Sequence, residues 1–167
     1  MEELARQLHP MGLGQKRILI VVATGTCGTH AGLVAGARAQ SQPFDILGVS
    51  VSGSTPVKLI KTAKVATETL QLAGYDHLVE PGEIWIEDRY IGSGYGELTK
   101  ECCQAITTAA VTEGLFLDPV YTGKAMAALL DMGPSGQLSK YDAVVFLHTG
   151  GLPLLFQYDS ALVSFNK

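Results

Sequence analysis

The segment ILIVVATGTCGTHAGLVAG, from Ile18 to Gly36, decides the fold. It opens with a continuous run of Ile and Val, breaks at TGTCGT (24–29), and continues in small residues as far as Ala39. A short apolar run, a Gly/Thr turn and a small-residue segment are typical of a strand, a loop and a helix. The near-continuous apolarity of the strand favours a parallel sheet that is covered on both faces.

The loop has the composition of a phosphate seat. Amides that open a helix, together with the helix dipole, favour a negatively charged ligand. Gly25 and Gly28 allow a close approach of the backbone, and the hydroxyls of Thr26 and Thr29 add donors. A tight turn without a ligand is the alternative. Neither familiar nucleotide pattern is present, because Cys27 interrupts Gly-x-Gly-x-x-Gly and no Gly-Lys-Ser/Thr ends the loop.

The bulk composition excludes several classes of function. The 167 residues have a formal net charge of −4 and no basic cluster, which argues against nucleic-acid binding. No apolar run reaches the ~20 residues that a membrane span needs, and the N-terminus lacks a signal-peptide core. Three cysteines form no disulfide framework, so a cytoplasmic location is expected.

The chain is unusually apolar for one domain of its size. Hydrophobic residues make up 47% and charged residues 17% of the sequence. This balance predicts an apolar surface that missing chain, a partner or a second copy covers. We therefore expect self-association, as a homo-oligomer, of the isolated chain.

Strand and helix patterns alternate along the chain. Strands are expected at 17–23, 44–51, 84–86 and 141–147, and helices at 2–9, 31–39, 57–73, 99–113 and 123–132. In the third helix, one apolar face is expected to hold Val57, Ile60, Ala63, Ala66, Leu70 and Ala73. Short connections predict right-handed crossovers. We expect a single α/β domain over 1–167, Rossmann-like, with a mainly parallel sheet and helices on both faces.

Four ordered motifs carry a family resemblance. They are GTCGTHAGLVAG (25–36), IGSGYGELT (91–99), EGLFLDPVYTGKAM (113–126) and VVFLHTGGLPLLFQY (144–158). Together they resemble the pyridoxal-phosphate enzymes of the tryptophan synthase β type, fold type II. The match is closest to the branch of D-cysteine desulfhydrase and 1-aminocyclopropane-1-carboxylate deaminase. The resemblance covers nearly the whole chain, and it implies a pyridoxal 5′-phosphate cofactor and a small amino-acid substrate.

The resemblance also implies a missing part. Family members are roughly twice this length, as expected of a two-domain enzyme. Their Schiff-base lysine lies upstream of the phosphate loop, in an N-terminal half with no counterpart here. The chain resembles the C-terminal portion of the large, cofactor-binding domain, and its implied partner is the N-terminal half, in the same chain or another.

By resemblance, the cofactor phosphate is held by Gly25, Thr26, Cys27, Gly28 and Thr29. The family usually has glycine in place of Cys27. A side chain there is expected either to narrow the phosphate seat or to force a different turn. A reactive thiolate at a helix N-terminus is a third reading of Cys27, but no partner base is evident.

Two tyrosines are the implied catalytic residues. The resemblance places the phenol of Tyr95 near the substrate or leaving group and Tyr121 beside the cofactor, where phenols can exchange protons. In isolation Gly94-Tyr95-Gly96 is also consistent with a turn adopted for shape. Thr122 follows at the cofactor ring nitrogen, or caps a helix. Its hydroxyl, unlike a carboxylate, leaves that nitrogen largely neutral, which favours β-elimination of sulfide over cyclopropane opening.

The remaining polar residues are assigned by resemblance or by context. Thr149 and Gly150 are expected to border the substrate pocket, whereas His148 is equally consistent with a turn. His30 is expected to pack. Lys124 is expected to be structural or electrostatic rather than the Schiff-base residue. The other lysines considered are expected in solvent: Lys16, Lys58, Lys61, Lys64, Lys100 and Lys140. No metal site is expected, because Cys102, Cys103 and the histidines lack ligand spacing.

Two functional hypotheses follow. In the first, the chain is part of a pyridoxal-phosphate lyase or deaminase that is active only with its other half. In the second, it is a standalone, non-catalytic α/β domain that binds a phosphate-bearing small molecule.

Overall fold

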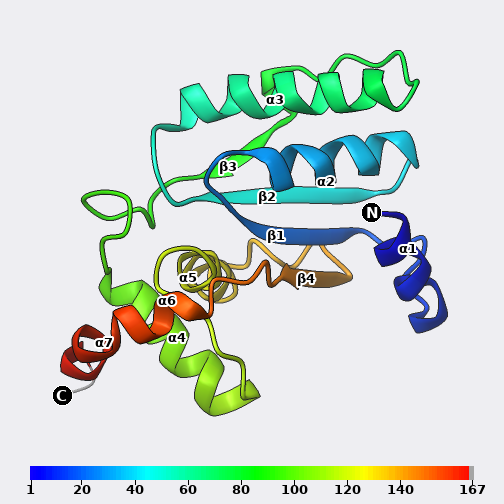
Figure 1. The fold of residues 1–167 in the computed structure, drawn as a ribbon. Coiled ribbons are helices and arrows are strands. Elements are labelled where there is room, and N and C mark those ends of the chain that lie inside the picture. Colours follow the sequence, from blue (N-terminus) through cyan, green and yellow to red (C-terminus); the bar gives the residue numbers. More distant parts are fainter. Residues whose placement is uncertain (166–167) are drawn as a thin grey trace.

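A computed structural model describes residues 1–165 of the chain. It is a four-stranded sheet flanked by helices, drawn in Figure 1. The elements, in chain order, are α1 (Glu2–Leu8), η1 (His9–Met11), β1 (Ile18–Thr24), α2 (Gly28–Ala39), β2 (Phe44–Ser50), α3 (Thr55–Leu72), η2 (Pro81–Glu83), β3 (Trp85–Glu87), α4 (Lys100–Glu113), α5 (Thr122–Met132), β4 (Ala143–Leu147), α6 (Pro153–Gln157) and α7 (Asp159–Phe165).

The sheet is parallel throughout, in the order β3-β2-β1-β4. All seven residues of β1 are buried, because β1 pairs on both sides, with β2 and with β4. The predicted α/β class with a parallel sheet is therefore confirmed. Because all strands point the same way, the loops that follow them meet at one edge of the sheet.

Alternate residues of β1 face two different helical layers. Ile18, Ile20 and Val22 belong to a core shared with α1, α2 and α3. Leu19 and Val21 belong to a second core shared mainly with α5. Figure 1 shows α2 and α3 on one side of the sheet, and α4 and α5 on the other. The expectation of helices on both faces is thus correct.

Local signals in the sequence set the bounds of α4. The hydroxyl of Thr99 accepts a hydrogen bond from the amide of Cys102, which caps the first turn. Gly114 ends the helix in the left-handed conformation, with φ of 65°. These bounds agree with the helix expected over 99–113.

The predicted apolar face of α3 is partly wrong. Ala63, Ala66 and Leu70 are buried, but Val57 is 64% and Ile60 61% exposed. The core-facing side of the first turns carries Lys58 and Thr62 instead, and both are buried. The apolar periodicity missed this because α3 begins beside polar loops, where the groups to be contacted are backbone carbonyls.

The strand β4 lies at an edge of the sheet, and each of its five residues is only half-buried. The apolar surface expected from the composition is therefore present along this edge. Within residues 1–165, no helix is both long and apolar enough to cross a membrane. The same residues contain no cluster of three or more His, Cys, Asp or Glu side chains able to hold a metal ion.

Candidate functional site

A cleft of about 530 Å³ lies at the edge of the sheet where the strands end. The loops after β1, β2 and β4 and the loop carrying Tyr95 all contribute to it. Its lining is made of Ala23, Gly25, Thr26, Thr29, Ser52, Lys61, Tyr95, Tyr121, Thr149, Gly150 and Gly151. Ligands of open α/β sheets bind at this edge.

The loop 24–29 joins β1 to α2 by a tight turn. Cys27 precedes the helix with φ of 75°, a left-handed conformation that residues other than glycine rarely adopt. Its side chain is 2% exposed and is not among the residues that line the cleft, so it does not narrow the cleft where the loop borders it. The first amides of α2 have no acceptor in a preceding turn, which leaves them for a ligand.

The two predicted catalytic tyrosines meet beside this loop. The phenol oxygens of Tyr95 and Tyr121 are hydrogen-bonded, and their rings stand edge to face with centroids 6.0 Å apart. A Cβ built on Gly25 would lie 3.7 Å from the ring of Tyr121. The hydrogen bond between Tyr121 and Tyr95, aided by burial, raises the pKa of Tyr121 to about 12. Tyr121 therefore keeps its proton at neutral pH.

Asp118 organises the start of α5. Its buried carboxylate accepts hydrogen bonds from the amides of Val120, Tyr121 and Thr122, at 2.7 to 2.8 Å. It also accepts the hydroxyl of Thr122 at 2.7 Å. These four bonds fix the backbone that carries Tyr121. Sequence analysis did not single out Asp118, although an Asp before a helix start is a recognised capping signal.

Thr122 is fully buried and is not among the residues that line the cleft. Its hydroxyl donates to Asp118 and accepts from the amide of Asp118 at 2.9 Å. The helix cap is thus supplied by Asp118 rather than by Thr122.

The loop after β4 closes the cleft opposite α2. Thr149 and Gly150 line it, as the resemblance implied. Gly150 and Gly151 have φ of 99° and 94°, and a Cβ on Gly151 would collide with the carboxylate of Asp118. Both positions therefore favour glycine by conformation, and Gly151 is required by contact as well. His148 is exposed and holds this turn, since its Nδ1 accepts from the amide of Gly150 at 3.2 Å.

The lysines depart most from expectation. Lys58 is buried rather than solvated, and its ammonium donates to the carbonyls of Thr24 (3.2 Å) and Gly25 (2.5 Å). Lys61 is exposed as predicted but lines the cleft. Lys124 is buried and donates to the carbonyl of Ile91, in agreement with a structural role.

Two further residues lie in or near the site: His30, which was expected to pack, and Ser52, which was not predicted. His30 packs against β2 so closely that a Cβ on Gly48 would clash with its ring, and burial lowers its pKa to about 4. It is neutral packing, as predicted. Ser52 lines the cleft and was missed, although a hydroxyl directly after a predicted parallel strand is a usable signal.

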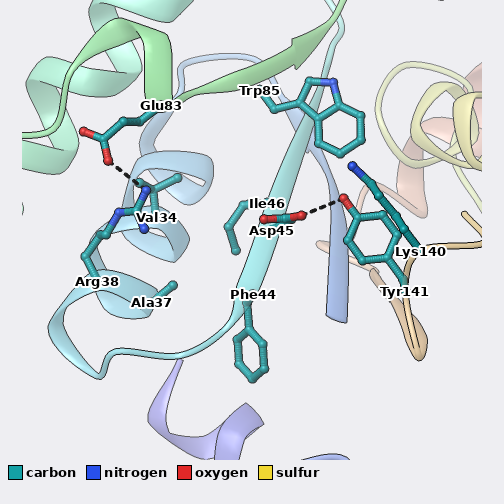
Figure 2. A pocket seen from close by; sticks show the side chains of 10 residues that line it. All are labelled: Val34, Ala37, Arg38, Phe44, Asp45, Ile46, Glu83, Trp85, Lys140 and Tyr141. Carbon is teal, nitrogen blue, oxygen red and sulfur yellow. Dashed lines mark hydrogen bonds and ion pairs between the residues drawn. The ribbon is translucent and has the colours of Figure 1, made fainter. Parts of the chain in front are cut away.

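A second, smaller pocket of about 250 Å³ lies at the opposite end of the strands, where they begin. Figure 2 shows its polar side chains turned toward one another: Arg38 bonds Glu83 at 2.8 Å, and Tyr141 donates to Asp45 at 2.7 Å. Arg17 also reaches Asp45, at 3.0 Å. These groups pair among themselves, so fewer polar groups remain free to bind a ligand in this pocket than in the cleft.

Comparison with known proteins agrees with this geometry. A family model described as "Pyridoxal-phosphate dependent enzyme" matches residues 1–150. A protein of Pyrococcus abyssi (strain GE5 / Orsay), named a putative 1-aminocyclopropane-1-carboxylate deaminase, is 36% identical over 162 residues, 96% of this chain and 47% of its own length. The crystal structure of an ACC deaminase homologue matches with a TM-score of 0.82 and 32% identity, covering 98% of this chain and 48% of that one. The chain thus spans about half the length of these relatives.

Proposed function

The chain belongs to the family of pyridoxal-phosphate-dependent enzymes, and from this premise we propose that it is the C-terminal portion of a lyase or deaminase acting on a small amino acid. We propose D-cysteine, cleaved by β-elimination to pyruvate, sulfide and ammonia, as its substrate. One observation carries the proposal: the phosphate-type loop and the two tyrosines line the same cleft.

The residues of the cleft fit the cofactor. Amides of residues 25–29 and the hydroxyls of Thr26 and Thr29 would hold the ester phosphate at the start of α2. Gly25 and Tyr121 both line the cleft, so a cofactor held by the loop would lie beside this tyrosine. When bound, pyridoxal phosphate supplies the electron withdrawal that weakens bonds at the α-carbon of an amino acid.

The tyrosine pair is suited to moving one proton. Two phenols carry two hydrogens, of which one lies in the bond between Tyr95 and Tyr121. The second hydrogen, on the accepting phenol, remains free for a substrate atom. Tyr95 is 59% exposed, so it is accessible to a ligand in the cleft. We assign the pair to protonating the leaving group or the substrate carbon.

The neutral side chain at position 122 supports elimination of sulfide. Thr122 carries no charge, and its hydrogen is already donated to Asp118. Thr122 is buried outside the lining of the cleft, so position 122 would offer a cofactor there no carboxylate. A ring nitrogen without a carboxylate partner would not be held in the protonated form, which suits a good leaving group better than ring opening. The name of the Pyrococcus abyssi relative favours 1-aminocyclopropane-1-carboxylate as the competing substrate.

The other half of the enzyme would supply the lysine that bonds the cofactor. Lys58 is buried behind the loop, outside the lining of the cleft, and Lys61 lines the cleft together with Thr26 and Thr29 of the loop. The half-buried, apolar edge of β4 gives the missing half a surface on which to continue the sheet.

The test is to add pyridoxal phosphate, then borohydride, to the chain with and without the N-terminal half of a relative. A covalent adduct on the added half, with β-elimination of D-cysteine, is expected from the mixture. An adduct on the chain alone that disappears in Lys61→Met would contradict the half-enzyme proposal. Ring opening of 1-aminocyclopropane-1-carboxylate faster than D-cysteine cleavage would overturn the substrate. Phosphate-ester binding by the chain with no adduct in the mixture would favour the non-catalytic domain.

A further inference from the structure

Lys58 is a buried cation directly behind the phosphate loop. It lies on the first turns of α3, is 5% exposed, and reaches across to the end of β1. Its ammonium donates to the carbonyls of Thr24 and Gly25, the residues that lead into the loop. A carbonyl that bonds to this buried ammonium points away from the cleft, and this restricts the orientation of the peptide group that follows it. Lys58 therefore acts on the direction in which the loop amides point.

The charge of Lys58 has no carboxylate to balance it. Within residues 1–165, no Asp or Glu forms an ion pair with its ammonium. The neighbouring groups that affect its charge are the Cys27 thiol and the ammonium of Lys61, and burial is the main cause that lowers its pKa. An uncompensated buried charge is destabilising unless an anion or strong dipoles offset it. Carbonyl dipoles offset part of this charge, and a ligand phosphate in front of the loop would offset more.

From these contacts we infer that Lys58 is a positioning residue that sets the phosphate selectivity of the cleft. It holds the loop carbonyls inward so that the amides face the cleft, and its charge favours a dianionic ester over the corresponding alcohol. This inference rests on the proposed cofactor seat. It does not make Lys58 a catalytic residue, because the loop separates its ammonium from the cleft, whose lining it does not join.

Three variants separate the tether from the charge. Lys58→Met removes both, and Lys58→Gln keeps amide donors for the carbonyls but removes the charge. Lys64→Met is the matched control, because Lys64 lies on the same helix but is exposed, and its one ion pair within residues 1–165 is with Glu68, at 3.9 Å. Thermal unfolding of each variant is measured first to show that it folds.

Two measurements use the 167-residue chain itself. The first is amide hydrogen exchange of residues 24–29 without ligand. The second is the affinity for pyridoxamine 5′-phosphate and for pyridoxamine by calorimetry, since neither probe needs a Schiff-base lysine. In Lys58→Met we expect about tenfold faster exchange and about tenfold weaker binding of the phosphorylated probe, with pyridoxamine unchanged. Lys58→Gln should lose the phosphate preference but keep slow exchange, and Lys64→Met should match the wild type.

The outcomes decide separately on Lys58 and on the proposed function. Equal exchange and equal phosphate preference in Lys58→Met and the wild type overturn the inference. An equal loss of both probes also overturns it, because a merely structural residue would weaken both alike. If the wild-type chain does not prefer the phosphorylated probe, the cofactor seat is wrong for this chain. The exchange measurement then decides the tether alone: unchanged exchange in Lys58→Met overturns it, and faster exchange supports it.

Discussion

The two ends of the sheet use polar side chains in opposite ways. At the end where the strands begin, Arg17, Asp45 and Tyr141 bond to one another, and Arg38 bonds to Glu83. At the end where the strands stop, the buried Asp118 and Lys58 bond to backbone groups instead. Because these bonds hold the backbone on the side away from the cleft, its free amide donors and its side chains face the cleft. Polar groups that satisfy one another stabilise a surface, whereas polar groups that hold the backbone prepare a site.

The largest expected effect is on stability at the cleft. Asp118→Asn should lower the free energy of unfolding by about 3 kcal/mol, because a buried carboxylate that accepts four hydrogen bonds becomes a neutral amide. Urea unfolding followed by circular dichroism measures this loss. If Asp118→Asn lowers the free energy of unfolding by less than Asp45→Asn does, the proposed difference between the two ends of the sheet is wrong.

Next in size is an effect on ligand binding. Gly28→Asp places a carboxylate at the first position of α2, where a Cβ meets nothing within 4 Å, so the fold should be retained. Repulsion should weaken binding of pyridoxamine 5′-phosphate by about 100-fold. Gly32→Asp is the control, since Gly32 has equal space one turn further along the same helix. Equal binding by the two variants would show that phosphate does not bind at the loop.

A smaller effect is expected in the tyrosine pair. Tyr95→Phe removes the hydrogen bond that is the main cause of the raised pKa of Tyr121, so that pKa should fall from about 12 toward the ordinary value of 10. Ultraviolet titration of the phenolate measures the change. Because the folded state holds this proton more tightly than the unfolded chain does, the bond stabilises the fold below pH 10. That contribution is lost as the pH rises to 12, and Tyr95→Phe should show a smaller loss, because burial and Asp118 still raise the pKa of Tyr121.

The smallest effect is expected at the opposite end. Asp45→Asn weakens the contacts with Arg17 and Tyr141, but the Asp45 side chain is 40% exposed and its ion pair with Arg17 is screened by solvent. The loss in unfolding free energy should stay below about 1 kcal/mol, with no change in phosphate binding. The raised pKa of Tyr141, caused mainly by burial and then by Asp45, should fall part of the way. A change in ligand affinity would show that the two ends are coupled.

Sequence patterns predicted the fold well because its signals are local. The apolar run of β1, the cap at Thr99 and the stop at Gly114 each depend on residues close by in the chain. The four motifs occur in the order found in the family, and this resemblance predicted that the loop 24–29 and the two tyrosines belong to one site. The carboxyl ends of parallel strands then place these motifs at one edge.

What the sequence could not predict depends on contacts across the chain. Lys58 has the spacing and composition of a solvated helix residue, and its burial follows from carbonyls 33 and 34 positions away. Lys61 joins the cleft for a related reason, because the first turns of α3 lie beside the end of β1, where Lys58 bonds to Thr24 and Gly25. The left-handed turn at Cys27 also follows from the tight junction of β1 and α2 rather than from any preference of cysteine.

The register of the central strand has a consequence for how the molecule forms. Ile18 lies beside Phe44 on one side but beside Ala143 on the other, so β1 gains its second neighbour from the far end of the polypeptide. The entropy lost in closing so long an intervening segment must be overcome before β1 and β4 can pair, and this slows folding relative to the pairing of strands that are neighbours in sequence. One side of β1 therefore stays unpaired until β4, which extends to residue 147, has been added to the chain.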